Sequence, residues 1–211
     1  SGNVIRNSRF YNSDAQWHAG FTMENLYENN FIDARRGSGS YGYGLYASGP
    51  WSGLHGPQGP RNVVYNNDIV SPKDSIQMLG GNEGWIILYN RFVSEKGRAI
   101  YTREKSFDHL IEGNVFVMLR ATLPPVYLGV DSTGVDLVNN AFYGATPPIV
   151  GFAGGITSLA RDEGNTISPE VPEPLPERPQ PAVPSIYEWQ REHIAEIRAA
   201  AEAREEAKRA P

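Results

Sequence analysis

The stretch Asn62-Val-Val-Tyr-Asn-Asn-Asp-Ile69 carries the pattern that decides the fold: an asparagine, a hydrophobic residue, two variable residues and a second pair of asparagines. Close copies are Asn3-Val-Ile-Arg-Asn-Ser-Arg-Phe10 and Asn25-Leu-Tyr-Glu-Asn-Asn-Phe-Ile32. Degenerate copies are Ile86-Ile-Leu-Tyr-Asn-Arg-Phe92, Leu110-Ile-Glu-Gly-Asn-Val-Phe116 and Asp136-Leu-Val-Asn-Asn-Ala-Phe142. Repeats of this length indicate stacked supersecondary units, because one unit cannot bury its own apolar face.

Aligning the copies places one residue of each in a single column: Ser8, Asn30, Asn67, Asn90, Asn114 and Asn140. Successive members are 22, 37, 23, 24 and 26 residues apart. Apolar residues alternate over short stretches, which is the period of a strand, and the residues between them favour turns. A second strand is predicted 14 residues before the column, at Ile76, Ile100 and Val126. Three short strands per repeat predict one rung of a parallel β-helix, with the column asparagines bonded from rung to rung.

With this repeat and this asparagine column, the chain resembles the right-handed parallel β-helices of the pectate-lyase-like superfamily. The resemblance covers residues 1–167 and implies an all-β solenoid. Members of the superfamily include polysaccharide lyases, glycoside hydrolases, epimerases, esterases, phage tailspikes and adhesins, so the fold does not choose among these functions. We expect a secreted or cell-surface protein.

The pattern ends before residue 168. Residues 168–184 are rich in proline and predict an extended linker, or strap. Residues 185–211 predict an α-helix, because Ser185-Ile-Tyr-Glu188 reads as a capping box. An apolar stripe follows at helical spacing: Ile186, Trp189, His193, Ile194 and Ile197. We expect this helix either to cap the chain's own last rung or to join subunits of a homo-oligomer.

Composition limits the partners. The net charge is −5, and from Ser168 on nine acidic and six basic residues leave 15 and 13 for the repeats. This near balance excludes a basic stripe for nucleic acid. No run of about 18 apolar residues predicts a membrane span. No capping element precedes Asn3, so we expect an upstream segment or another chain to cover the first rung.

The strand alternation predicts an aromatic strip on the outside. If Ile76, Ile100 and Val126 point inward, the next residue of each strand points outward: Gln77, Tyr101 and Tyr127. Extending the register back adds Tyr46 and Trp17, and the insertion that lengthens one repeat, residues 41–60, adds Trp51 and His55 as candidate binding residues. Flat amphipathic rings suit the apolar faces of sugars. Stacking between rungs that only stabilises the sheet is an equally good explanation.

The densest charged cluster of the repeats provides the candidate catalytic residues: Arg103, Glu104, Lys105 and His109. A lyase acting on a uronic acid polymer needs a base and a cation, whereas a hydrolase needs two carboxylates. The outward strand residues are not acidic, which disfavours enzymes of the pectate lyase or polygalacturonase type. A solvated turn is the alternative for each of these residues. The sequence shows no metal triad and leaves the cofactor unknown.

A basic series is predicted on the opposite turn: Arg35, Arg36, Lys73, Lys96, Arg98 and Arg120. Acidic neighbours interleave with it, so we expect a mixed solvated edge. The sequence as a whole predicts a module that binds polysaccharide along the aromatic strip and leaves open whether it also degrades it. The alternative is a non-catalytic structural or assembly module, as in tailspikes, adhesins or filaments.

Overall fold

The computed structural model describes residues 1–17, 22–35, 41–48, 58–103, 105–120, 124–155 and 157–209. The chain forms two compact units, Ser1–Gln180 and Pro181–Pro211. Candidate residues Trp51, His55 and Glu104, together with Arg36, lie outside the described residues.

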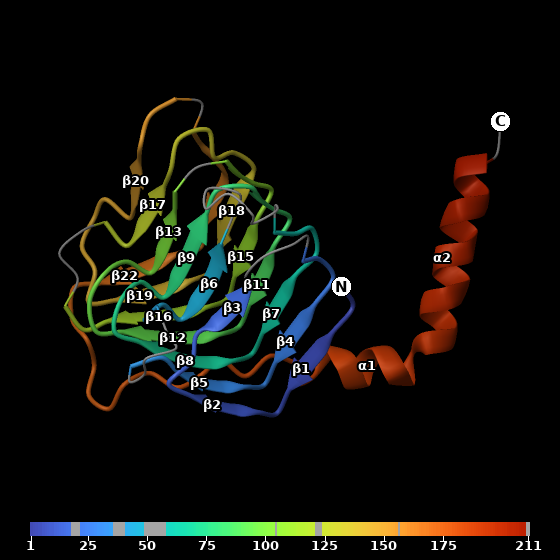
Figure 1. Cartoon of the computed structure of the whole chain (residues 1–211), viewed down its shortest axis with the longest axis horizontal. Helices are drawn as coiled ribbons and strands as arrows, with labels where there is room; N and C mark the ends of the chain where they lie inside the picture. The colour runs from blue at the N-terminus through green and yellow to red at the C-terminus, as the bar shows by residue number, and fades with distance from the viewer. Residues whose placement is uncertain are drawn as a thin grey trace. The chain divides into compact units, whose positions relative to one another are not determined.

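Three parallel sheets form the walls of the first unit, and each rung supplies one strand to each sheet (Figure 1). Sheet A contains β1(Val4–Arg6), β4(Leu26–Glu28), β7(Val63–Tyr65), β11(Ile86–Leu88), β15(Leu110–Glu112), β18(Val135–Val138) and β21(Leu159–Glu163). Sheet B contains β2(Arg9–Tyr11), β5(Phe31–Asp33), β8(Asp68–Ser71), β12(Arg91–Ser94), β16(Val115–Met118), β19(Ala141–Tyr143) and β22(Thr166–Ser168). Sheet C contains β3(Ala15–Trp17), β6(Leu45–Ser48), β9(Ile76–Leu79), β13(Ile100–Thr102), β17(Val126–Leu128) and β20(Val150–Phe152). The short strands β10(Asn82–Glu83) and β14(Ser106–Phe107) pair beside them. The predicted parallel β-helix is confirmed.

The core consists of the inward residues of all three sheets, stacked rung upon rung. Those predicted from alternation are all buried: Ile76, Ile87, Ile100, Ile111, Val126 and Leu137. In sheet B, Phe92, Phe116 and Phe142 stack with successive ring centroids 5.1 Å apart. That distance is close to the spacing of neighbouring strands, about 4.8 Å, so identical rungs bring identical side chains into contact.

The predicted asparagine column forms a continuous ladder. The backbone N–H of Asn67 donates to Oδ1 of Asn90 at 2.8 Å, and that of Asn90 donates to Oδ1 of Asn114 at 2.9 Å. The same bond recurs from Ser8 to Asn30 and continues beyond the repeats read from sequence to Asn165. The amide side chains donate back to carbonyls, as Asn114 does to Ile87 at 2.9 Å. The ladder therefore satisfies backbone groups that the buried turns would otherwise leave unpaired.

The residue before each ladder position turns the chain from sheet A to sheet B in the left-handed conformation. These residues are Asn7, Asn29, Asn66, Tyr89, Gly113, Asn139 and Gly164, with φ between 52° and 65°. Glycine has no Cβ to clash at positive φ, and asparagine tolerates it better than most residues. This requirement explains why the repeat so often carries two asparagines in succession.

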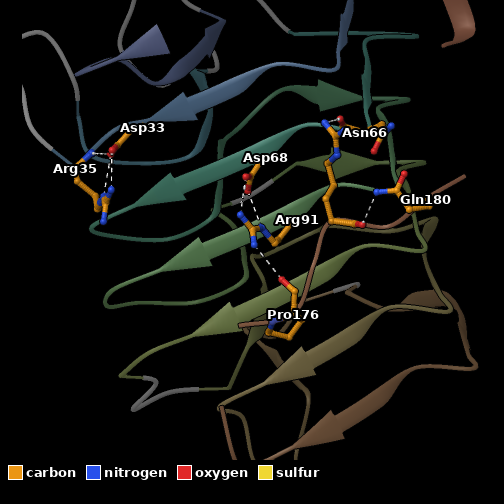
Figure 2. Close-up of polar contacts among 8 residues, drawn as sticks. Asp33, Arg35, Asn66, Asp68, Arg91, Pro176 and Gln180 are labelled. Atoms are coloured by element: carbon orange, nitrogen blue, oxygen red, sulfur yellow. Dashed lines mark hydrogen bonds and ion pairs between the residues drawn. The ribbon is translucent and has the colours of Figure 1, made fainter. Parts of the chain in front are cut away.

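The strap follows β22 and lies along the outside of sheet B within the first unit. Close to the last rungs, the N–H of Gly144 donates to the carbonyl of Glu170. Further along, Arg91 donates from Nη1 to the carbonyl of Pro176 at 3.0 Å (Figure 2), and Arg178 donates from Nη1 to the carbonyl of Asn66 at 2.8 Å. Because Gly144, Arg91 and Asn66 belong to progressively earlier rungs, the strap runs back along the solenoid.

The second unit contains two helices in place of the single one expected, α1(Ile186–Glu192) and α2(Ile194–Arg209), with His193 between them. The predicted cap is present, since Oγ of Ser185 accepts the N–H of Glu188 at 3.1 Å. Neither helix buries a residue, and Trp189 and Ile194 are 43% and 46% exposed. Capping or assembly by this unit stays a prediction. In the described part of the chain, no helix is long and apolar enough to cross a membrane.

Candidate functional site

The outer face of sheet C carries the strip that alternation predicts. Leu45, Ile76, Ile100 and Val126 belong to the core. The residue after each of them therefore points outward, and strand pairing aligns these residues as Tyr46, Gln77, Tyr101 and Tyr127. The column begins at Gln16 and ends at Gly151.

Trp17 is not part of this strip, contrary to the prediction. It pairs with Ala47, is 4% exposed and lies in the core, with its ring 4.8 Å from that of Trp85. Gln16 occupies the outward position instead. A shift of one residue reverses the face of every side chain in a strand, and the long insertion between the first strands of sheet C removes the constant spacing that fixes the register elsewhere.

Five tyrosines gather on this face in two groups. The ring of Tyr46 lies 5.1 Å from that of Tyr41 and 5.4 Å from that of Tyr43, while Tyr101 and Tyr127 stack at 5.6 Å and 15°. Gln77 lies between the groups, paired with Tyr46 on one side and Tyr101 on the other. We call these five tyrosines, with Gln77 and Arg98, the tyrosine patch. It spans four adjacent strands of sheet C.

Arg98 supplies the positive charge of the patch. Its Cζ lies 5.2 Å from the ring centroid of Tyr101 and 4.9 Å from that of Tyr127, within the range of cation–π contacts. Its Nε is buried, as is Oε1 of Gln77, and neither atom has a hydrogen-bond partner among the described residues. A buried polar group without a partner is costly. The patch therefore offers one unused donor and one unused acceptor beside its rings.

The segment that carries Tyr41 and Tyr43 is held by two charged side chains. The carboxylate of Asp14 accepts the N–H groups of Tyr41 and Gly42 at 2.8 and 3.2 Å. Nζ of Lys73 donates to the carbonyl of Tyr41 at 2.8 Å and lies 5.1 Å from the ring centroid of Tyr43. Glycine suits position 42, because its φ is +83°. These contacts order the tyrosines that stack on Tyr46.

Asp74 positions the start of the segment that carries Arg98. Its Oδ1 accepts the N–H of Arg98 at 2.6 Å, and a Cβ at Gly97 would lie 2.5 Å from the same oxygen. Burial raises the pKa of Asp74, against the opposing effect of that N–H bond and of the Arg98 and Lys73 charges. Burial also raises the pKa of Tyr43, and Asp74 and Asp14 raise it further. The phenol of Tyr43 is therefore neutral at physiological pH.

The predicted catalytic cluster is not assembled. Arg103 and Lys105 are exposed, but His109 is 1% exposed and turned into the core. Nδ1 of His109 accepts the N–H of Trp85 at 3.2 Å, and burial lowers the pKa of its imidazole to about 3. The placement of His109 beside an accessible charged turn is therefore wrong.

His109 occupies a second ladder that sequence reading missed. The first asparagine of each repeat forms it: the N–H of Asn3 donates to Oδ1 of Asn25, and that of Asn25 to Oδ1 of Asn62. In the later rungs the same column holds Trp85 and His109, and the imidazole accepts a bond as an amide would. Its alignment with the first asparagine of the repeat was the signal for a structural role.

Three residues of the patch were not assigned to it from sequence. Tyr41 and Tyr43 lie in the insertion, whose course no repeat predicts. Arg98 was placed in the basic series on the opposite turn, as was Lys73. Their side chains lie over rings of the patch instead, because the turn before β9 and β13 brings them to the sheet C face.

The fold and this face together define the chain as a parallel β-helix protein with a tyrosine patch on one sheet. No family model, curated protein or solved structure matches it.

Proposed function

We propose that the chain is a secreted or cell-surface module of the pectate-lyase-like superfamily that binds polysaccharide along the tyrosine patch. The observation that carries the proposal is the patch itself: five tyrosines across adjacent rungs, with the unused polar atoms of Arg98 and Gln77 beside them. Ring faces contact the apolar faces of sugars, while phenol, amide and guanidinium groups bond to hydroxyls. A repeating surface of this kind suits a repeating ligand.

Binding is better supported than degradation. The two carboxylates nearest the patch, Asp14 and Asp74, already accept backbone N–H groups and order the surrounding turns. A glycosidase needs one carboxyl group to protonate the leaving oxygen and another to act as base or nucleophile. His109 is buried, which leaves Arg103 and Lys105 of the described cluster accessible. A uronic-polymer lyase that uses them is the enzymatic form of the proposal.

A panel of soluble neutral and acidic polysaccharides tests both forms. Binding is followed by tyrosine and tryptophan fluorescence, lyase activity by absorbance of the unsaturated product, and hydrolysis by the release of reducing ends. We expect at least one binder with a dissociation constant below millimolar. Activity that persists in an Arg103→Ala, Lys105→Ala variant would exclude that cluster, and a panel with no binder would exclude the binding proposal.

An assembly module is the second candidate, favoured by the exposed Trp189 and Ile194 of the second unit. Apolar side chains on an amphipathic helix gain stability when a partner covers them. Homo-oligomerisation through α1 and α2 is compatible with glycan binding and would make the module multivalent.

A further inference from the structure

A groove lies between the strap and the outer face of sheet B, away from the tyrosine patch. Its volume is about 640 Å³, and its walls come from the turns and strands of the first rungs on one side and from residues 177–180 of the strap on the other. The strap is fixed over it by Arg91, which Figure 2 shows between Asp68 and Pro176. The groove therefore exists only while the strap lies against the sheet.

Arg91 contributes to the walls of the groove but leaves little charge for a ligand. Its Nε and Nη2 donate to the two carboxylate oxygens of Asp68 at 2.7 and 2.6 Å, and its Nη1 donates to the carbonyl of Pro176. Such a two-bond pairing is among the stronger ones available to arginine. The positive charge of Arg91 is thus neutralised within the protein.

Two other arginines of the groove are not neutralised. Among the described residues, no carboxylate pairs with Arg9 or Arg178. Arg178 donates one bond, to the carbonyl of Asn66, and Arg9 lies with its Cζ 5.9 Å from the ring centroid of Phe31. A guanidinium has five N–H donors, so most of those in this groove are unused. Glu177, on the exposed strap, carries the one negative charge of the groove besides Asp68.

We propose that this groove binds an oxyanion, a carboxylate or a sulfate ester, held between Arg9 of the first rung and Arg178 of the strap. The planar guanidinium matches the two oxygens of such a group, and both arginines line the same groove. Phe31 offers an apolar face for the molecule that carries the anion. Because the two arginines come from opposite walls, the bound anion also ties the strap to the first rungs.

The test is a titration of the full chain with glucuronate, inorganic sulfate and glucose at constant ionic strength, followed by the backbone amide shifts of Asn7, Phe31 and Arg178. Constant salt is needed because exposed charges are screened. We expect saturable shifts with both anions, or with glucuronate alone if the carrier adds contacts, and none with glucose. Arg9→Gln and Arg178→Gln should each weaken anion binding about tenfold.

Arg120→Gln is the matched control, since it removes the same charge from an exposed turn that does not line the groove. Its affinity should equal that of the parent. No saturable shift with either anion, equal shifts with glucose, or equal weakening in all three variants would overturn the proposal. Folding of each variant is checked by its melting temperature, and Arg9→Lys, which keeps the charge but not the fork, should bind with intermediate affinity.

Discussion

Oδ1 of Asn114 accepts both the backbone N–H and the side-chain Nδ2 of Asn90, at 2.9 and 3.0 Å. The Nδ2 of Asn114 donates in turn to the carbonyls of Ile87 and Glu112. One buried amide therefore serves three neighbouring segments of the solenoid. This relationship recurs in most rungs, which makes the ladder the most repetitive polar element of the fold.

Replacing Asn114 with alanine should destabilise the protein by about 3 kcal/mol or more, because several buried groups lose their partner at about 1 to 3 kcal/mol each. Urea unfolding followed by circular dichroism measures the effect. Asn165→Ala is the control, since Asn165 ends the ladder in a less buried rung and should cost less. Equal losses for the two variants would mean that burial of the ladder does not determine its contribution.

The buried His109 predicts a pH dependence of stability. Its folded pKa is lowered to about 3 from 6.5, so the unfolded chain binds a proton below pH 6.5 that the folded chain refuses. The free energy of unfolding should therefore fall as pH falls from about 6.5 to about 3, by up to about 1.4 kcal/mol per pH unit from this group. Above pH 6.5 the contribution is fully present.

A His109→Asn variant isolates this effect, because asparagine can accept the Trp85 N–H but does not titrate. The gap in unfolding free energy between parent and variant should shift steadily in favour of the variant as pH falls from 6.5 to 3. His193→Asn, at an exposed position between the helices, should leave the parent's pH profile unchanged. Parallel curves for the parent and His109→Asn would contradict the prediction.

Arg91 should hold the strap in place. Arg91→Gln removes the bond to Pro176 and the pair with Asp68, so hydrogen exchange at the amides of residues 175–180 should accelerate about tenfold. The matched control is Arg35→Gln, which breaks a similar pair with Asp33 on the same sheet (Figure 2). Equal exchange of the strap in the parent and in Arg91→Gln would show that other contacts fix it.

Deleting residues 185–211 should lower the melting temperature or change the oligomeric state measured by light scattering. Covering Trp189 and Ile194 contributes about 1.5 to 3 kcal/mol for each side chain fully buried. Trp189→Ser with Ile194→Ser should reproduce the effect if these two side chains form the contact. A truncated chain that melts and sediments like the parent would make the second unit a passenger.

Sequence predicted what repeats and missed what does not. The ladder from Asn30 to Asn140 and the outward Tyr101 and Tyr127 follow from constant spacing, because the rung geometry repeats with it. Trp17 was misplaced because the insertion interrupts the spacing. His109 was misread because an imidazole there replaces an amide acceptor. The path of the strap could not be predicted, since a proline-rich segment has no periodic face that fixes its partner.

The central claim is that the tyrosine patch binds glycan. Isothermal titration of the best binder from the panel into the Tyr101→Ala, Tyr127→Ala variant tests it most directly, with Tyr143→Ala on the outside of sheet B as control. Each lost ring should cost about 1 kcal/mol, so the double variant should bind roughly thirtyfold more weakly at an unchanged melting temperature, and the control should bind like the parent. Parent-like affinity in the double variant would contradict the account.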